Sequence, residues 1–489
     1  MDYLDPHKER RHQVVIMVGY VLIAIAIALG TRLLLLQAYG FGLGKDGIII
    51  QNGLTYFSSQ PHPARIFLNG KLEPTATNTR LFLPAGIYQA KLDRAGYRLW
   101  NRTIELQGGD VQHFDYPLLI PKQLTTKKIQ DYTAIPGLFT QSPDRRWLLV
   151  EEPKSMTDFK VYDLKNPARP PLALSLPATL LTKATAGENW QLEEWGDDNV
   201  HVVLQHNYDG KTEFILLNRT DAIQSVNLNN TLASNPAKLT LDNKKYDRYY
   251  LYDTSGALRT ATLSAPTPVP LLEHVLAYQS YGSNSVLYVT DNGAPAGKVL
   301  VKLQTGSQTY NLRSLPAGTT YLVNLTQYSG TLYVALGAVS ENKVYIYADP
   351  VGQLQSQPKQ ALTPAQVLHV NGPNYLGFSN NAQFISVEGG NQFGVYDIQN
   401  TKGYSYVTPA PLDAPQVHAA WMDGDRLAYV SGGKLLEFDY DGTNLQTLMP
   451  ADSKFLPAFA PDFKNVYDVA PNAGTAELTQ TSLLIPADR

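Results

Sequence analysis

The pattern of hydrophobic and polar positions divides this chain into one uninterrupted apolar run and a much longer region of short alternating segments. The run Val14–Thr31 contains no charged residue, and as a helix it would be roughly 27 Å long, close to the hydrocarbon thickness of a bilayer. Basic residues precede it (Lys8, Arg10 and Arg11), and the positive-inside rule places them in the cytoplasm. The pattern predicts a cytoplasmic tail at 1–13 and a transmembrane anchor at 14–36.

A cleaved signal peptide is the alternative interpretation of this run. Ala24-Ile25-Ala26 and Ala26-Ile27-Ala28 both match the small-x-small pattern of a cleavage site. Both triplets lie inside the apolar run without a polar stretch before the cut, and the run is longer than a usual signal-peptide core. We therefore expect an uncleaved, single-pass protein of the cell membrane, with most of the chain extracytoplasmic.

Beyond a stalk at 37–47, apolar and polar residues alternate with a period of two. Tyr88, Ala90 and Leu92 alternate with polar neighbours, as expected for a strand with one buried face. Asn69-Gly70 is a strong signal for a two-residue hairpin turn. Turn residues recur about every ten positions, so residues 48–120 are predicted to form a small β-sandwich.

The same region resembles the PEGA domain, a β-sandwich module of bacterial and archaeal surface proteins. The resemblance rests on four segments in the family's order: Pro61-His62-Pro63-Ala64, Ile66–Gly70, Leu83-Pro84-Ala85-Gly86 and Gly96–Trp100. The chain departs from the Pro-Glu-Gly-Ala stretch that gives the family its name. The resemblance implies a spacer or binding module of the cell envelope and provides no catalytic residues.

Residues 121–489 show a degenerate repeat in which strand, Asp/Asn/Gly turn and strand recur every 35–55 residues. The clearest copies are 139–164 and 378–398, and about eight fit in the region. Repeats of this length are typical of β-propeller blades, because sheets in a ring cover one another's faces. Ser142-Pro143-Asp144 and Phe438–Asn444 resemble the TolB-type propeller repeat, and a stack of adhesin-like β-sandwich domains is the alternative. The predicted fold is all-β after one N-terminal transmembrane helix: a PEGA-like β-sandwich, then a seven- or eight-bladed β-propeller.

Composition excludes several classes of function. The 489 residues include no cysteine, which rules out disulfides and thiolate metal sites. The net charge of −3, without a cluster of Lys and Arg, gives no electrostatic basis for binding nucleic acid.

The candidate metal ligands do not form a convincing set. His201 and His206 are five residues apart on one predicted strand, so they should point to opposite faces. The turn acids are expected to cap turns rather than bind Ca²⁺ (Asp197-Asp198, Asp423-Gly424-Asp425 and Asp439-Tyr440-Asp441). The sequence therefore assigns no catalytic, cofactor-binding or metal-ligating residue, and no cofactor.

One acidic pair leaves an enzymatic alternative open. Glu193 and Glu194 lie between Trp190 and Trp195, which resembles a glycosidase cleft with an aromatic platform. A glycan hydrolase or lyase would need acids in the central funnel of the propeller, so a position on the outer rim would exclude this pair. The leading hypothesis is a binding or scaffolding surface for an envelope polymer, such as cell-wall polysaccharide, or for a surface protein. Transmembrane signalling would require a membrane partner.

Overall fold

The computed structural model describes residues 6–38, 40–43, 49–357, 360–413 and 417–488. They group into two compact units. The sandwich unit extends to Gln123 and also includes Ile485–Asp488 near the end of the chain, and the propeller unit is Leu124–Leu484. The two units are described separately below.

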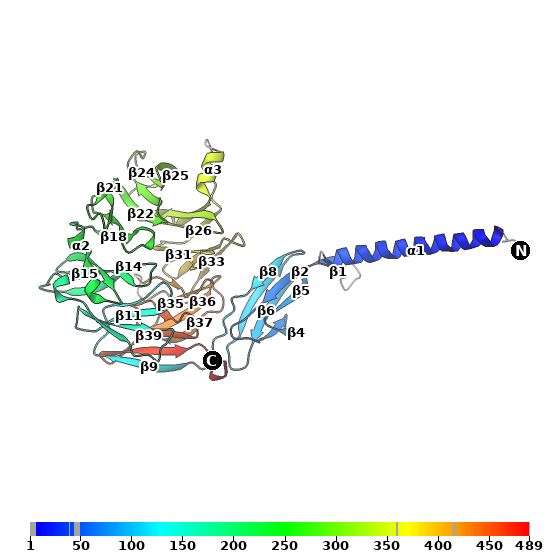
Figure 1. The fold of residues 1–489 in the computed structure, drawn as a ribbon, viewed down its shortest axis with the longest axis horizontal. Helices are drawn as coiled ribbons and strands as arrows, with labels where there is room; N and C mark the ends of the chain where they lie inside the picture. The colour runs from blue at the N-terminus through cyan, green and yellow to red at the C-terminus, as the bar shows by residue number, and fades with distance from the viewer. Residues whose placement is uncertain (1–5, 39, 44–48, 358–359, 414–416, 489) are drawn as a thin grey trace. The chain divides into compact units, whose positions relative to one another are not determined.

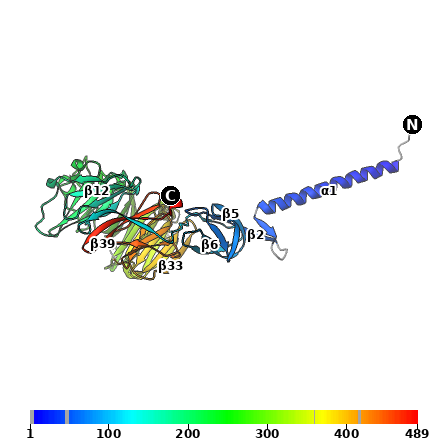
Figure 2. The same ribbon diagram turned by 90° about the horizontal axis from the view of Figure 1, so that it is seen from below.

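Helix α1 (Pro6–Ala38) is a single long helix in the sandwich unit (Figure 2). Its stretch Arg10–Arg32 has a mean hydropathy of 2.6 and is long and apolar enough to cross a membrane. Large apolar side chains along it are exposed, for example Met17 at 69% and Tyr20 at 70%. The helix contains the predicted span and begins earlier, at Pro6, so part of the predicted tail is helical.

Two four-stranded sheets form the sandwich. In the first sheet, β2 pairs with β5 along one edge and with β1 and β8 along the other, and the β2–β8 pair is parallel. In the second sheet the order is β4-β3-β6-β7. The strands are β1 (Phe41–Leu43), β2 (Ile49–Phe57), β3 (Arg65–Leu68), β4 (Lys71–Ala76), β5 (Thr79–Pro84), β6 (Gly86–Asp93), β7 (Trp100–Leu106) and β8 (Val111–Phe114).

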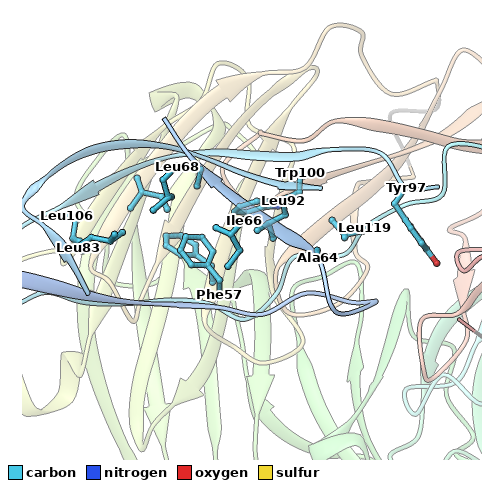
Figure 3. Close-up of a cluster of buried hydrophobic side chains, with 13 residues drawn as sticks. Phe57, Ala64, Ile66, Leu68, Leu83, Leu92, Tyr97, Trp100, Leu106 and Leu119 are labelled. Carbon is cyan, nitrogen blue, oxygen red and sulfur yellow. The ribbon is translucent and has the colours of Figure 1, made fainter. Parts of the chain in front are cut away.

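The sandwich confirms the alternation in the sequence. The turn between β3 and β4 is Asn69-Gly70, and both residues have positive φ (50° and 80°), as the tight hairpin turn requires. Alternate residues from both sheets meet in one core, in which Phe57, Ile66 and Trp100 are at most 1% exposed (Figure 3).

The segment Ile485–Asp488 packs on the sandwich and ends in a short 3₁₀ helix, η5 (Pro486–Asp488). The backbone amide of Ile485 donates to the Tyr97 hydroxyl (3.1 Å), which donates to Asp488 (2.7 Å). Arg94 forms an ion pair with the same carboxylate. Burial of the ring is the largest of the effects that raise the pKa of Tyr97 to about 12, and the Asp488 carboxylate acts in the same direction. The predicted propeller boundary of 121–489 is therefore wrong for these residues, because the sandwich supplies their polar partners.

The described residues of the propeller unit form eight four-stranded sheets, and in seven of them the strands pair in chain order. The first four sheets contain β10 (Phe139–Gln141), β11 (Trp147–Glu151), β12 (Asp158–Asp163) and β13 (Leu172–Ser175); β14 (Glu188–Trp195), β15 (His201–Tyr208), β16 (Lys211–Asn218) and β17 (Val226–Asn227); β18 (Lys238–Leu241), β19 (Arg248–Tyr252), β20 (Leu258–Thr262) and β21 (Val269–Leu272); and β22 (Val275–Tyr281), β23 (Ser285–Thr290), β24 (Lys298–Thr305) and β25 (Gln308–Pro316).

The remaining four sheets follow along the chain from green to red in Figure 1, and the cyan strand β9 completes the last of them. They contain β26 (Tyr321–Tyr328), β27 (Thr331–Ala338), β28 (Lys343–Ala348) and β29 (Gln366–His369); β30 (Tyr375–Phe378), β31 (Phe384–Gly389), β32 (Gln392–Asp397) and β33 (Lys402–Val407); β34 (Ala420–Trp421), β35 (Arg426–Ser431), β36 (Lys434–Asp439) and β37 (Gln446–Pro450); and β38 (Ala458–Phe459), β39 (Asn465–Asn472), β40 (Thr475–Ser482) and β9 (Thr125–Tyr132). Short helices lie in the connections: η1 (Ala178–Leu180), η2 (Ala222–Gln224), α2 (Leu228–Thr231), η3 (Asp242–Lys244), η4 (Val339–Glu341) and α3 (Pro350–Ser356).

The last sheet joins the two ends of the unit. Strand β9 comes from the beginning of the propeller unit and β40 from its end. The two strands pair antiparallel, and Tyr132 lies opposite Ala476. Apolar side chains of this sheet pack against the sheet that begins with β10, and one such cluster contains Tyr132, Leu148 and Leu478. From the sheet β10–β13 to the sheet β30–β33, consecutive sheets pack in the same way. Phe393 on β32 also contacts Phe438 on β36 of the following sheet. Neighbouring sheets thus cover one another, and the sheet shared by β40 and β9 joins the two ends of the unit, which confirms the β-propeller.

Candidate functional site

The first strands of neighbouring sheets lie side by side and form an inner wall of the propeller. β14 lies beside β18, and β22 lies beside β26 (Figure 1). β26 also contacts β30. A hollow of about 620 Å³ opens along this wall and a second of about 320 Å³ adjoins it. They share Lys238, Tyr278 and Gln279, so we treat them together and call them the channel hollow.

Both acidic residues singled out in the sequence line this hollow. Glu193 and Glu194 are on β14, although neighbouring side chains of a regular strand point to opposite faces. The register shifts between Leu192, which faces Leu204, and Glu194, which faces Val203, so Glu193 is the extra residue of a β-bulge. A bulge redirects side chains, and here it brings adjacent carboxyl groups into one hollow.

The two carboxyl groups have different surroundings. Burial raises the pKa of Glu193, while a hydrogen bond from the Gln205 side chain and the charge of Lys238 act in the opposite direction. Glu194 accepts a hydrogen bond from the Leu241 amide (2.7 Å) and forms an ion pair with Lys244. Glu194 therefore connects the second and third sheets, whereas Glu193 is held on its own sheet by Gln205.

Tyrosine rings line the rest of the hollow: Tyr252, Tyr278, Tyr321 and Tyr375. Hydroxyl hydrogen bonds fix three of them, because Tyr278 pairs with Thr240 (3.0 Å), Tyr252 donates to the Val275 carbonyl (3.0 Å) and Tyr321 donates to that of Pro316 (3.0 Å). Rings held in this way offer preformed aromatic edges and faces at little entropic cost on binding.

Tyr375 belongs to a further polar group next to the hollow. Its ring stacks on His418 with 4.3 Å between centroids and 11° between planes. Nδ1 of His418 lies 3.5 Å from the Glu388 carboxylate, which accepts a hydrogen bond from the Ala419 amide (2.9 Å). The stack and the buried carboxylate hold Tyr375 in place at this side of the hollow.

The tryptophans do not form the proposed aromatic platform. Trp190 and Trp195 are 2% and 5% exposed and pack between the first and second sheets. Their indole N–H groups donate inside the protein, to the Met156 carbonyl (3.1 Å) and the Thr140 hydroxyl (3.0 Å). This part of the glycosidase hypothesis is wrong, because the rings belong to the core, although the acids next to them do line the hollow.

The histidines are separated, as their spacing on one strand predicts. His201 contacts Asp198 (2.6 Å), whereas His206 is fully buried against Glu213 (2.8 Å). Throughout the part of the chain that the structure describes, no group of three His, Asp or Glu residues could hold a metal ion.

The turn acids act as caps. The Asp198 carboxylate accepts the amides of Val200 and His201 (2.9 and 3.0 Å). Asp423 caps the amides of Asp425 and Arg426 (both 2.8 Å), and Asp441 holds Thr443.

Sequence reasoning did not identify Lys238, Tyr278 or Tyr375 as residues of a site. The chain has 30 tyrosines, and no local pattern separates those in the hollow from those between sheets. Each of the three lies on the first strand of a sheet, and this common feature becomes visible only after the sheets are assigned.

Comparison with known protein families identifies the sandwich. Residues 54–120 match the family model of the PEGA domain. Among curated proteins, no sequence matches this chain significantly.

Solved structures resemble the chain at low identity. Oligogalacturonate lyase from Vibrio parahaemolyticus is 8% identical with a TM-score of 0.40, over 75% of this chain and 98% of the lyase. The C-terminal WD40 domain of Sif2 is 12% identical with a TM-score of 0.38, over 88% of this chain and 96% of that domain. The dihydro-heme d1 dehydrogenase NirN is 14% identical with a TM-score of 0.40, over 65% and 67%. Such distant similarity carries no information about activity.

Proposed function

We propose that this protein is a membrane-anchored binding protein whose propeller holds an extended polysaccharide of the cell envelope in the channel hollow. The observation that carries the proposal is the set of fixed tyrosine rings, next to Lys238 and the two glutamates. Aromatic faces and edges suit sugar rings, and a few polar groups around them would orient the hydroxyl groups of a ligand.

The rest of the chain supports an anchored role. Helix α1 is exposed along its apolar stretch, which is unfavourable in water and expected in a bilayer. The basic residues before the apolar run favour a cytoplasmic N-terminus, which places the sandwich and the propeller outside the cell membrane. The PEGA domain would then act as a spacer between the membrane and the propeller.

The test measures binding of cell-wall glycan fragments to the full-length protein in nanodiscs by calorimetry. Loss of one stacking ring should weaken binding about tenfold, so Tyr321→Ala, which removes a half-buried ring of the hollow, is expected to show this loss. Tyr310→Ala is the matched control, because Tyr310 lies on β25 outside the residues that line the hollow. Equal affinity of the two variants, or no binding by the unmodified protein to any fragment, would contradict the proposal.

A second candidate function follows from the position of Glu193 and Glu194 in the hollow instead of on the outer rim. A buried carboxyl with a raised pKa next to a second carboxylate is an arrangement used for general acid catalysis of glycan cleavage. Incubation with the same fragments distinguishes the candidates. An enzyme would release shorter products and lose this activity with Glu193→Gln while binding is kept, whereas a binding protein would release none.

A further inference from the structure

A second large hollow of the propeller lies between the third and fourth sheets, which begin with β18 and β22. Its volume is about 500 Å³, and we call it the intersheet hollow. Strands of both sheets line it, together with helix η3, the turn between β22 and β23 and the connection between β20 and β21. Most of its lining residues are polar.

The residues on the facing strands explain why the two sheets separate here. Where the sheets pack closely, Leu258 of the third sheet and Val275 of the fourth belong to one apolar cluster. Thr260 and Thr262 follow Leu258 at alternate positions of β20, so their side chains point to the same side of the sheet. Gln304 on β24 lines the hollow from the fourth sheet. Polar side chains thus occupy positions between the sheets that are apolar further along, and the sheets stay apart.

Several of these polar groups have hydrogen-bonding capacity left. Among the described residues, the half-buried Thr260 hydroxyl has no hydrogen-bonding partner. The Arg248 guanidinium lies 3.9 Å from the Asp247 carboxylate, which is too far for a hydrogen bond. The Gln304 amide donates to the Gly306 carbonyl (3.2 Å), and its oxygen remains available as an acceptor. Hydroxyl, amide and guanidinium groups of this kind match the many hydroxyl groups of a sugar chain.

The intersheet hollow adjoins the channel hollow. Helix η3 and the turn between β22 and β23 separate the two, and η3 contacts β22. On η3, Asp242 lines the intersheet hollow and Lys244 lines the channel hollow. In the turn, Ser283 lines the intersheet hollow and Gly282 lines the channel hollow. A Cβ atom on Gly282 would meet no other atom within 4 Å, so the boundary is open at this glycine.

We infer that the intersheet hollow is a second binding site for the polysaccharide of the proposed function, which reaches it from the channel hollow across Gly282. The inference rests on that function, because the continuous path is what identifies the occupant. Tyrosine rings of the channel hollow hold one part of the chain. Arg248, Thr260 and Gln304 form hydrogen bonds with the sugars that follow it. Affinity therefore depends on the length of the chain.

Calorimetry with the full-length protein in nanodiscs tests this dependence, with cell-wall glycan fragments from disaccharide to octasaccharide. The octasaccharide is expected to bind about tenfold more tightly than the tetrasaccharide, since a hydrogen bond to a charged group contributes roughly that factor. Arg248→Ala should remove this gain and leave tetrasaccharide binding unchanged. Ser283→Trp should do the same, because it places a large ring on the path beside Gly282.

Arg259→Ala is the matched control. Arg259 also lies on the third sheet, forms an ion pair with Asp253 (3.0 Å) and is outside the lining of both hollows. Equal affinity for short and long fragments would overturn the intersheet site alone, as would weaker tetrasaccharide binding by Arg248→Ala. The same loss with Arg259→Ala would also overturn it, because a general effect of charge would then explain the result. Absence of binding at every length would contradict the proposed function itself.

Discussion

The sandwich and the propeller differ in the kind of polar side chain that each buries. Among the described residues, the buried polar side chains on the sandwich strands and loops are hydroxyls, and Ser59 and Thr77 bond each other (2.7 Å). The propeller buries ionisable groups, among them Glu151, Glu213 and Arg426. A hydroxyl group keeps its proton across the physiological pH range, so its hydrogen bonds do not change. A carboxyl group can gain or lose a proton, which changes the hydrogen bonds that it forms. Stability of the sandwich should therefore depend on packing, and stability of the propeller also on pH.

The two units also differ in how many faces of each sheet are covered. In the propeller most sheets pack against two neighbours, so the surface that stays accessible lies along the inner wall and the loops. In the sandwich each sheet covers only one face with the other, and the outward faces remain available. This difference explains why the candidate site of the propeller is a central hollow.

The largest effect is expected for Trp100→Ala, which removes the largest side chain of the single sandwich core. Truncation of a fully buried tryptophan costs about 3–5 kcal/mol. Denaturation followed by circular dichroism should show a strongly shifted transition for the sandwich and an unchanged one for the propeller. A shift of both transitions by the same amount would show that the units unfold together.

Glu151→Gln tests the pH dependence of the propeller. Burial raises the pKa of Glu151 from 4.5 to about 7, against the effect of hydrogen bonds from the amides of Gly137 and Leu138. The folded state thus binds a proton more tightly than the unfolded state. The associated stability is present in full below pH 4.5 and is lost as the pH rises through 7. The loss is on the order of 3 kcal/mol in the unmodified protein, and the glutamine variant should lack it.

Glu213→Gln should change the pH dependence of propeller stability in the direction opposite to Glu151→Gln. Its effect on stability at neutral pH should be smaller. Burial alone would raise the pKa of Glu213, but hydrogen bonds from His206, Thr182 and Asn227 outweigh it and lower this pKa to about 2. The stability from this carboxylate is present above about pH 4.5 and is lost as the pH falls through 2. We expect the variant to lose about 2 kcal/mol at pH 7 and little at pH 2. Urea titrations of both variants from pH 2 to pH 9 measure the two profiles together, and parallel profiles would refute the contrast.

Much of the fold is predictable from local pattern. Asn69-Gly70 identifies a hairpin turn, and the spacing of apolar residues identifies the strands on both sides of it. The recurrence of Asp/Asn turns identifies the propeller, because a sheet that is short, repeated and apolar on both faces is stable only in a ring. Strand β9 has no such signal, since Thr125–Tyr132 is mostly polar and exposed and pairs with a strand almost 350 positions later.

The candidate site was only partly predictable. Glu193 and Glu194 were noted because they are adjacent to each other and to tryptophans. The bulge that turns both toward the hollow results from pairing with β15 and has no local signature. The tryptophans were misassigned because a sequence does not show whether an aromatic side chain faces a cavity or a neighbouring sheet.

The sequence by itself determined the apolar helix, the two all-β architectures, and the exclusion of disulfides and thiolate metal sites. Each of these depends on residue type or on spacing within a few positions. The tertiary structure decided which strand completes the last sheet, why Ile485–Asp488 belongs to the sandwich, and which tyrosines line the channel hollow. These features arise from contacts between residues far apart in the chain, where burial and hydrogen-bond geometry, not local preference, select the partner.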